Sequence, residues 1–386
     1  MNTSFSSLIL TIFIMSTTVG FSQKTKITNV EWKKAAQLQN ADGSLSLGFA
    51  GPINGITNNV LMVAGGANFP DKMPWEGGKK QYSNEIHVLE KTGDDFHWNT
   101  KVTNTLPEPI AYPGNTTTNL GVVYVGGENE NGLSNKVYLL NWNADKNEVE
   151  TKSLPDFPIA ITNIALTHLE NIVYAIGGDE AKQSSDLVFS LDLNAEKPEW
   201  KLLTKLPFAL ANSVSVIQNN TIYVIGGRTK TSTGISDLHN TTLAFDLNKQ
   251  NWETKANISD GKQTTNFSAG AGVAIGNENI LILGGDNGTT FHKIETFLSQ
   301  IAKATSEEEK LKLIAEKNIL NTTHKGFYND ILVYNTHTNK WSKLGELPFL
   351  AQVTTTATIW NDKVVLSNGE IKPGIRTPDV MLGTIK

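Results

Sequence analysis

Short apolar runs that each end at a glycine recur along the chain. The runs are rich in β-branched residues, which is typical of buried strands. Five end in a pair of glycines and a sixth ends in Asn-Gly, and the second residues of these pairs are Gly66, Gly127, Gly178, Gly227, Gly285 and Gly369. Successive intervals are 61, 51, 49, 58 and 84 residues. A unit of about 50 residues with paired glycines predicts blades of a β-propeller of the kelch type.

The stretch from residue 211 to 255 shows how one unit is built. Four strands are predicted, at Val214–Ile217, Thr221–Ile225, Thr242–Asp246 and Trp252–Lys255. Asn219-Asn220 lies between the first two and is typical of a hairpin turn. Phe245 and Trp252 fall on the two outer strands, where large aromatic side chains can pack one blade against the next. Each unit is therefore a four-stranded antiparallel blade.

The two ends of the chain predict how the ring of blades closes. After Gly369, only Asp379–Leu382 remains as a third strand of the sixth blade. Ile27–Lys33 looks like a fourth strand, yet no blade precedes it. We therefore expect the N-terminal strand to complete the C-terminal blade, which would leave no open sheet edge. The predicted fold is an all-β, six-bladed kelch-type propeller over residues 23–386.

The long fifth interval contains a segment with helical rather than strand periodicity. Apolar residues recur at helical spacing from Ile294 to Ile301, and Ser306–Glu309 has the pattern of a capping box before a second apolar run. The sequence therefore predicts a small helical insertion in the fifth blade, at about residues 290–325. Because the insertion belongs to the loops that follow the glycine pairs, we expect it to cover one mouth of the propeller.

The first 22 residues and the overall composition bear on the location of the protein and on its possible partners and cofactors. An apolar run at Leu8–Met15, followed by small residues at Gly20 and Ser22, predicts a signal peptide over residues 1–22. The net charge of -5 gives no electrostatic signal for nucleic acid, and the apolar run is too short to span a bilayer. The chain has no cysteine, which excludes disulfides and thiolate metal sites. We expect an exported protein without a metal or cofactor.

Arginine is the most informative residue type for function. The chain has 31 lysines but only two arginines, Arg228 and Arg376, and both fall in loops that follow glycine pairs. A position that requires arginine indicates a planar donor that binds a carboxylate with two hydrogen bonds. Glu370 lies in the same loop as Arg376, six residues earlier. The two side chains could meet at one ligand or could form a surface salt bridge.

The segment Asn368–Thr377, with the sequence Asn-Gly-Glu-Ile-Lys-Pro-Gly-Ile-Arg-Thr, resembles a segment of the bacterial N-acetylneuraminate epimerases, also called sialic acid mutarotases. Gly48–Gly51 and Gly65–Phe69 are similar to that family as well. The glutamate segment lies near the C-terminus here, whereas it lies mid-chain in the better-known members. The chain therefore resembles the cyclically permuted branch of the family.

The resemblance implies interconversion of the α and β anomers of free N-acetylneuraminate in the periplasm, without a cofactor. It implies that Glu370 accepts the proton and that Arg376 holds the substrate carboxylate. Other site residues are weaker candidates: Arg228 for a second anion contact, and Asn287 and Phe291 for the acetamido group or the ring face. The acid that protonates the ring oxygen stays open between Lys372, His292 and water.

Two other classes of propeller are excluded by composition, and one stays open. Sialidases use three arginines on the substrate carboxylate, and galactose oxidase requires a cysteine; this chain has two arginines and no cysteine. The remaining alternative is a non-catalytic kelch propeller that binds a glycan or a protein partner at the same mouth. Such a protein would not need Glu370 as a base, so a change at Glu370 discriminates between the two functions.

Overall fold

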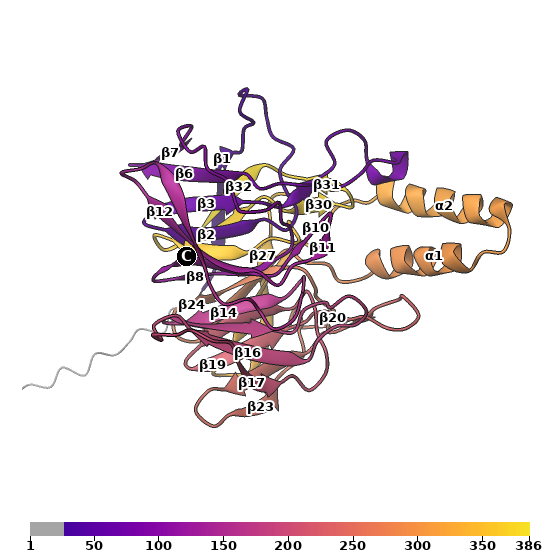
Figure 1. The fold of residues 1–386 in the computed structure, drawn as a ribbon. Helices are drawn as coiled ribbons and strands as arrows, with labels where there is room; N and C mark the ends of the chain where they lie inside the picture. Colours follow the sequence, from indigo (N-terminus) through magenta and orange to yellow (C-terminus); the bar gives the residue numbers. More distant parts are fainter. Residues whose placement is uncertain (1–26) are drawn as a thin grey trace, which may run out of the picture.

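The computed structural model describes residues 27–386 as six four-stranded antiparallel sheets arranged around a central axis (Figure 1). The predicted six-bladed propeller is confirmed. The signal peptide predicted over residues 1–22 lies outside the described residues. Within residues 27–386, no helix is long and apolar enough to cross a membrane.

The first three blades follow one another along the chain. Blade 1 contains β2 (Ile53–Thr57), β3 (Val60–Ala64), β6 (Ile86–Thr92) and β7 (Asp95–Trp98). Blade 2 contains β8 (Gly114–Thr118), β9 (Gly121–Val125), β12 (Val137–Asn143) and β13 (Glu148–Ser153). Blade 3 contains β14 (Ala165–Leu169), β15 (Ile172–Ile176), β16 (Leu187–Asp192) and β17 (Lys201–Lys205).

The last three blades repeat the same order of strands. Blade 4 contains β18 (Val214–Gln218), β19 (Thr221–Ile225), β22 (Thr242–Asp246) and β23 (Asn251–Thr254). Blade 5 contains β24 (Ala271–Ile275), β25 (Asn279–Leu283), β26 (Asp330–Asn335) and β27 (Lys340–Glu346). Blade 6 contains β28 (Ala357–Trp360), β29 (Lys363–Ser367), β32 (Asp379–Ile385) and β1 (Val30–Gln37).

Short two-stranded ribbons lie in the loops that connect the second and third strands of four blades. They pair β4 (Ala67–Asn68) with β5 (Gln81–Tyr82), β10 (Glu128–Asn129) with β11 (Gly132–Leu133), β20 (Arg228–Thr229) with β21 (Asp237–Leu238), and β30 (Glu370–Lys372) with β31 (Ile375–Arg376). A short 3-10 helix, η1 (Pro74–Glu76), lies between β4 and β5. These ribbons build up one end of the propeller.

The N-terminal strand closes the ring, as predicted, although its bounds differ from the prediction. β1 begins at Val30 and ends at Gln37, whereas the sequence predicts Ile27–Lys33. It pairs with β32 along its whole length, and Trp32 packs edge-on against Phe349 with ring centroids 5.4 Å apart. The prediction ends too early because the second half of this outer edge strand is lysine and alanine, which carry no strand pattern.

Aromatic side chains connect neighbouring blades, as the sequence predicts. Phe245 and Trp252 are opposite each other on β22 and β23 of blade 4, with ring centroids 5.0 Å apart, and they belong to one apolar cluster with Tyr174 and Val188 of blade 3. Trp341 of blade 5 donates a hydrogen bond from its indole nitrogen to the carbonyl of Ala256, 3.0 Å away, just beyond the outer strand of blade 4. A buried tryptophan therefore both fills the space between two blades and satisfies its own polar atom.

The sixth glycine-marked turn is a genuine blade turn. Asn368 adopts a φ of 59°, in the left-handed region where asparagine is the best tolerated residue after glycine. Its side-chain Oδ1 accepts a hydrogen bond from the backbone N–H of Phe49 at 3.1 Å, and Gly369 N donates to the carbonyl of Phe49 at 2.7 Å. Blade 6 is thus bonded to the segment that precedes blade 1, which reinforces the closure made by β1.

A closed ring of six backbone hydrogen bonds surrounds the axis. One residue from each blade donates its N–H to the carbonyl of the equivalent residue in the neighbouring blade, over distances of 2.8 to 3.0 Å. All six residues have positive φ between 53° and 61°, and they are Gly51, Tyr112, Asn163, Asn212, Ala269 and Thr354. Left-handed backbone at five non-glycine residues is costly and persists only where the surrounding structure enforces it, which this ring does.

The helical insertion is present in blade 5, as predicted. α1 spans Phe291–Lys303 and α2 spans Glu307–Thr322, and both project from the end of the propeller where β30 and β31 lie (Figure 1). Ser306 caps α2 by accepting a hydrogen bond from Glu309 N at 3.2 Å. The insertion returns to the blade at Tyr328, whose N–H donates to the carbonyl of Gly285 at 3.1 Å.

Candidate active site

One side chain from each blade is placed around the same end of the axis by a repeated backbone bridge. We call the closed circle of six hydrogen-bonded residues the axial ring. In each blade, the residue after the glycine pair forms backbone hydrogen bonds with the residue just before the axial-ring residue, as in Glu370 with Val353 and Arg228 with Ala211. The six equivalent residues are Ala67, Glu128, Asp179, Arg228, Asp286 and Glu370. Four acids and one arginine therefore surround this mouth of the propeller.

Glu370 and Arg376 meet across the ribbon of β30 and β31. Their backbones are opposite each other in the register, and Nη1 of Arg376 lies 3.7 Å from Oε1 of Glu370. Oε1 also accepts a hydrogen bond from the N–H of Gly374 at 2.7 Å. Gly374 turns the ribbon with a φ of 79° and packs against Pro74 and Trp75 of η1. The structure thus brings together the two residues predicted to carry the chemistry.

Arg376 is held deep in the protein. Its side chain is only 4% exposed, its Nε donates to the carbonyl of Ala67 at 3.3 Å, and its guanidinium lies 4.8 Å from the centre of the Phe69 ring. Within residues 27–386, its buried Nη1 has no hydrogen-bond partner. A buried donor without a partner is expensive, which makes this atom a candidate contact for an anionic group.

Tyr112 links the axial ring to this charged group. Burial raises the pKa of its hydroxyl, Lys80 and Arg376 act to lower that pKa, and Glu370 acts to raise it. Lys80 in turn lies 5.0 Å from the centre of the Tyr112 ring and 2.6 Å from Glu128. The Glu370–Arg376 pair is therefore embedded in a charge network on the side of blades 1 and 2.

A cavity of about 310 Å³ opens on the other side of Glu370, between the propeller and the helical insertion. We call it the mouth cavity. Its polar lining includes Arg228, Asp286, Asn321, His324 and Glu370, and its apolar lining includes Phe291, Ile294 and Phe327. A few polar groups among apolar side chains, at this volume, are typical of a small-molecule site.

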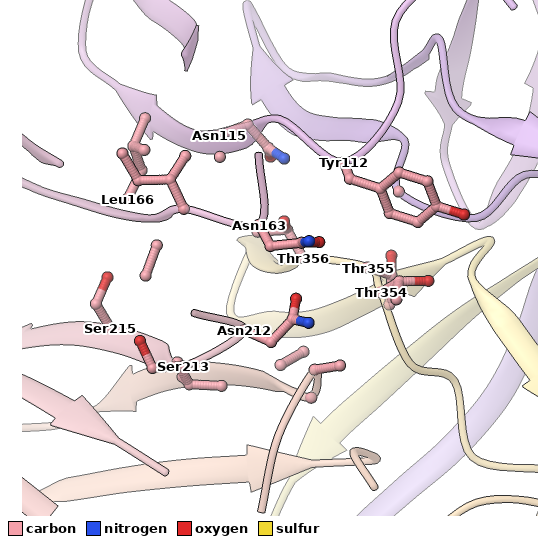
Figure 2. A pocket seen from close by; sticks show the side chains of 18 of the residues that line it. Tyr112, Asn115, Asn163, Leu166, Asn212, Ser213, Ser215, Thr354, Thr355 and Thr356 are labelled. Carbon is pink, nitrogen blue, oxygen red and sulfur yellow. The ribbon is translucent and has the colours of Figure 1, made fainter. Parts of the chain in front are cut away.

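The axial ring forms the floor of the mouth cavity. Asn212, Ala269 and Thr354 line both the mouth cavity and a smaller central cavity of about 110 Å³ below it. Figure 2 shows the side chains of Asn163, Asn212 and Thr354 around the central cavity. The hydrogen-bonded ring therefore supports the bottom of the site, whereas the insertion covers its top.

The insertion is attached to blade 4 by a carboxylate. Glu295 of α1 accepts hydrogen bonds from both the backbone N–H and the hydroxyl of Ser236, at 2.7 and 2.8 Å. Ser299 donates to the carbonyl of Thr233 at 3.0 Å. These contacts to the loop between β20 and β21 hold α1 over the mouth, so that its first residue, Phe291, lines the cavity.

Arg228 lines the mouth cavity but already has an anionic partner. Its Nη2 lies 2.6 Å from Oδ2 of Asp179, and Lys230 lies 3.5 Å from the other oxygen of the same carboxylate. Ser184 also donates to Asp179. The predicted second anion contact is therefore in the site, with its charge offset by the buried carboxylate of Asp179.

The other predicted site residues are distributed unevenly. Phe291 lines the mouth cavity, whereas Asn287, His292 and Lys372 are not among its lining residues. The Asn287 side chain accepts a hydrogen bond from Thr289 N at 3.1 Å within its own loop, and His292 is exposed. Burial and the charge of Lys372 both lower the pKa of His324, which does line the cavity.

Asp286 and His324 line the cavity and were not predicted. Asp286 is the residue directly after the fifth glycine pair, the same position that Glu370 occupies after the sixth, so the repeat itself could have identified it. His324 follows α2 and has no such signal. Within the described part of the chain, no group of three or more histidine and carboxylate side chains could hold a metal ion.

These features define a six-bladed propeller with an acid and an arginine beside a covered small-molecule cavity at one end of its axis. The sequence model of the N-acetylneuraminate epimerase family matches residues 16–149 and 154–386. Because this match covers most of the chain, the protein belongs to the N-acetylneuraminate epimerase family.

Individual relatives match parts of the chain. It is 42% identical to the N-acetylneuraminate epimerase of Vibrio cholerae over 129 residues, which are 31% of this chain and 32% of that protein. The enzyme of Salmonella typhimurium is 31% identical over 229 residues, 58% of this chain and 56% of the relative. The enzyme of Brucella melitensis is 26% identical over 236 residues, 60% and 59% of the two chains. The aligned regions thus span less than two thirds of each of these relatives.

The fold also matches a solved structure. The structure of YjhT superposes with a TM-score of 0.60, covering 88% of this chain and 97% of that chain at 15% sequence identity. At this identity the match supports the propeller fold and carries no statement about the site.

Proposed function

We propose that the protein interconverts the α and β anomers of free N-acetylneuraminate, with Glu370 as the proton acceptor. The observation that carries the proposal is the position of Glu370, whose carboxylate lies between the mouth cavity on one side and Arg376 on the other. The family name of the curated relatives supports the substrate.

Mutarotation requires a base that a carboxylate can supply. Removal of the proton from the anomeric hydroxyl opens the pyranose to the keto acid, and reclosure on the other face of the carbonyl gives the other anomer. Both the Gly374 hydrogen bond and the ion pair of Glu370 involve Oε1. Oε2 is therefore the oxygen that would take the proton from a sugar in the mouth cavity.

The substrate carboxylate is attached to the anomeric carbon itself, so its anchor must lie next to the base. Arg376 meets this requirement, because its Nη1 lies 3.7 Å from Glu370 and has no hydrogen-bond partner within residues 27–386. We propose that it holds the carboxylate. Arg376 does not itself line the mouth cavity, so the carboxylate would reach Nη1 from the side of Glu370, which does. Arg228, already paired with Asp179, would donate a second and weaker contact from the opposite wall.

The insertion would contact the rest of the sugar. Phe291, Ile294 and Phe327 offer apolar surface to a ring face or an acetamido methyl, and Asn321 offers an amide to a hydroxyl. We also propose that the reaction takes place in the periplasm, on the evidence of the apolar N-terminal run.

The proposal is tested by an NMR time course of freshly released α-anomer, with and without the purified protein. Acceleration toward the equilibrium mixture is the expected result. A protein that binds N-acetylneuraminate in calorimetry yet leaves the time course unchanged would instead be the non-catalytic glycan-binding propeller.

A further inference from the structure

Asp286 is the second carboxylate of the mouth cavity. It follows the glycine pair of blade 5, as Glu370 follows that of blade 6, and equivalent bridges place both residues on the rim of the axis, in adjacent blades. Both side chains line the same cavity. We propose that Asp286 is the general acid that protonates the ring oxygen while Glu370 deprotonates the anomeric hydroxyl. This inference rests on the function proposed above.

The surroundings of Asp286 favour the protonated form that an acid needs. Burial raises the pKa of its carboxyl and the nearby Glu370 raises it further, whereas a hydrogen bond from Gly288 N acts in the opposite direction. That bond, 2.5 Å long, falls on Oδ1 and leaves Oδ2 for the proton. The charged or titratable groups that share the cavity with it are Glu370 from β30, Arg228 from β20 and His324 after α2.

The two carboxylates have neighbours of opposite charge. Glu370 lies beside the guanidinium of Arg376, whereas Asp286 is influenced by the carboxylate of Glu370. Arg228, the cation of the cavity, is paired with Asp179 at 2.6 Å, so its charge is already offset. Two carboxyl groups whose environments differ in this way are the usual basis for separate acid and base roles at one site.

Other candidate donors fit less well. Lys372 and His292 do not line the cavity. His324 does, but burial and Lys372 lower its pKa, and its Nδ1 faces the N–H of Gly326 at 3.1 Å. That contact makes Nδ1 an acceptor and leaves the ring neutral, and a neutral imidazole is a poor proton donor. Asp286 is therefore the best placed acid among the lining residues.

The step balances without any further reactant. Oε2 of Glu370 takes the proton of the anomeric hydroxyl, and the electron pair of that O–H bond forms the keto C=O bond. The bond between the anomeric carbon and the ring oxygen breaks, and the ring oxygen takes the proton from Oδ2 of Asp286. After rotation about the bond between the keto carbon and its neighbour, the steps run in reverse on the other face. Both residues then return to their starting protonation states.

Asp286→Asn is the variant that tests this role. It keeps the size and can still accept a hydrogen bond from Gly288, but it cannot donate an acidic proton. General acid catalysis contributes about 10²- to 10⁴-fold, so kcat should fall by that order while KM changes little. Exchange would be measured by NMR saturation transfer, with substrate binding measured by calorimetry.

The pH profile separates an acid from a residue that only shapes the cavity. The acid is active below its pKa and is lost as the pH rises through it, so kcat/KM of the wild type should fall on the alkaline side. The alkaline fall should disappear in Asp286→Asn. A wild-type profile without an alkaline fall would overturn the proposal even if the variant failed to fold.

A control exists at the same end of the propeller, in blade 2. Glu130 is exposed in the turn between β10 and β11 and does not line the mouth cavity, so Glu130→Gln should keep kcat within a fewfold of the wild type. The two proposals fail differently. A wild type that does not accelerate exchange overturns the function itself, whereas an active wild type with a near-normal Asp286→Asn overturns only the role of Asp286.

Discussion

Replacement of Arg376 by lysine tests the proposed carboxylate contact most sharply. Lysine keeps the positive charge but loses the planar fork, the Nε hydrogen bond to Ala67 and the stacking on Phe69. If the substrate carboxylate uses the fork, the loss of one charge-assisted hydrogen bond costs about 1.5 to 3 kcal/mol. At about 1.4 kcal/mol for each tenfold change, the substrate Kd should rise roughly 10- to 150-fold.

The rate should change as well, because Nη1 of Arg376 also lies 3.7 Å from Oε1 of Glu370 and so helps to position the catalytic carboxylate. A shorter and more mobile cation holds both the carboxylate of the substrate and the carboxylate of Glu370 less firmly. Both kcat and KM should therefore worsen, as measured by NMR saturation transfer over a substrate series and by calorimetric binding. Melting temperature would be recorded in parallel, because a buried arginine also supports the fold.

Arg228→Lys is the matched control for this experiment. Arg228 lines the mouth cavity but is paired with Asp179, so its replacement should weaken binding less than that of Arg376. A larger effect at Arg228 would place the carboxylate on the opposite wall. Near-normal Kd and rate in a folded Arg376→Lys protein would refute the reasoning for Arg376.

Three further predictions concern the fold and the chemistry. Removal of β1, by starting the chain at residue 38, exposes the edge of β32 and loses both the burial of Val30 and the contact of Trp32 with Phe349. Solubility or melting temperature should therefore fall strongly. Equal melting temperatures of the shortened and full-length proteins would contradict the closure of the ring by β1. Asn368→Ala should lower the free energy of unfolding by about 2 kcal/mol or more, because alanine is strained in the left-handed region and loses the hydrogen bond to Phe49. Asn368→Gly should lower it less, as measured by chemical denaturation. The reverse order of the two variants would be inconsistent with this account. Dialysis against a chelator should leave the rate of anomer exchange unchanged, since residues 27–386 contain no cluster of metal ligands. Loss of that rate on dialysis and its rescue by added metal would rule out the acid–base mechanism.

The propeller could be predicted because every repeat requires the same backbone conformation at its turn, and few residue types allow that conformation. A turn that needs positive φ and close packing selects glycine, and Asn368 at φ 59° shows that such a turn also accepts asparagine. The axial ring could not be predicted, although it uses the same left-handed backbone. Five of its six residues carry side chains, among them Tyr112 and Ala269, because hydrogen bonds between blades enforce the conformation there.

The candidate site was predictable where it lies within one loop. Glu370 and Arg376 are six residues apart and face each other across one ribbon. Asp179, Asp286 and His324 reach the site from other blades or from the end of the insertion, and only the assembled ring brings them near Glu370 and Arg228. Lys372 and His292 were plausible donors by residue type, yet the cavity is lined by neighbouring residues instead.

The central claim is that Glu370 is the base, and Glu370→Gln tests it most directly. Glutamine keeps the shape of the side chain and can still accept the hydrogen bond from Gly374, but it cannot take the proton. Anomer exchange of N-acetylneuraminate would be measured by NMR saturation transfer at equal concentrations of wild type and variant, with binding checked by calorimetry. The account predicts a fall in turnover of roughly 10²- to 10⁴-fold with binding largely kept. Near-normal exchange in the folded variant would contradict it.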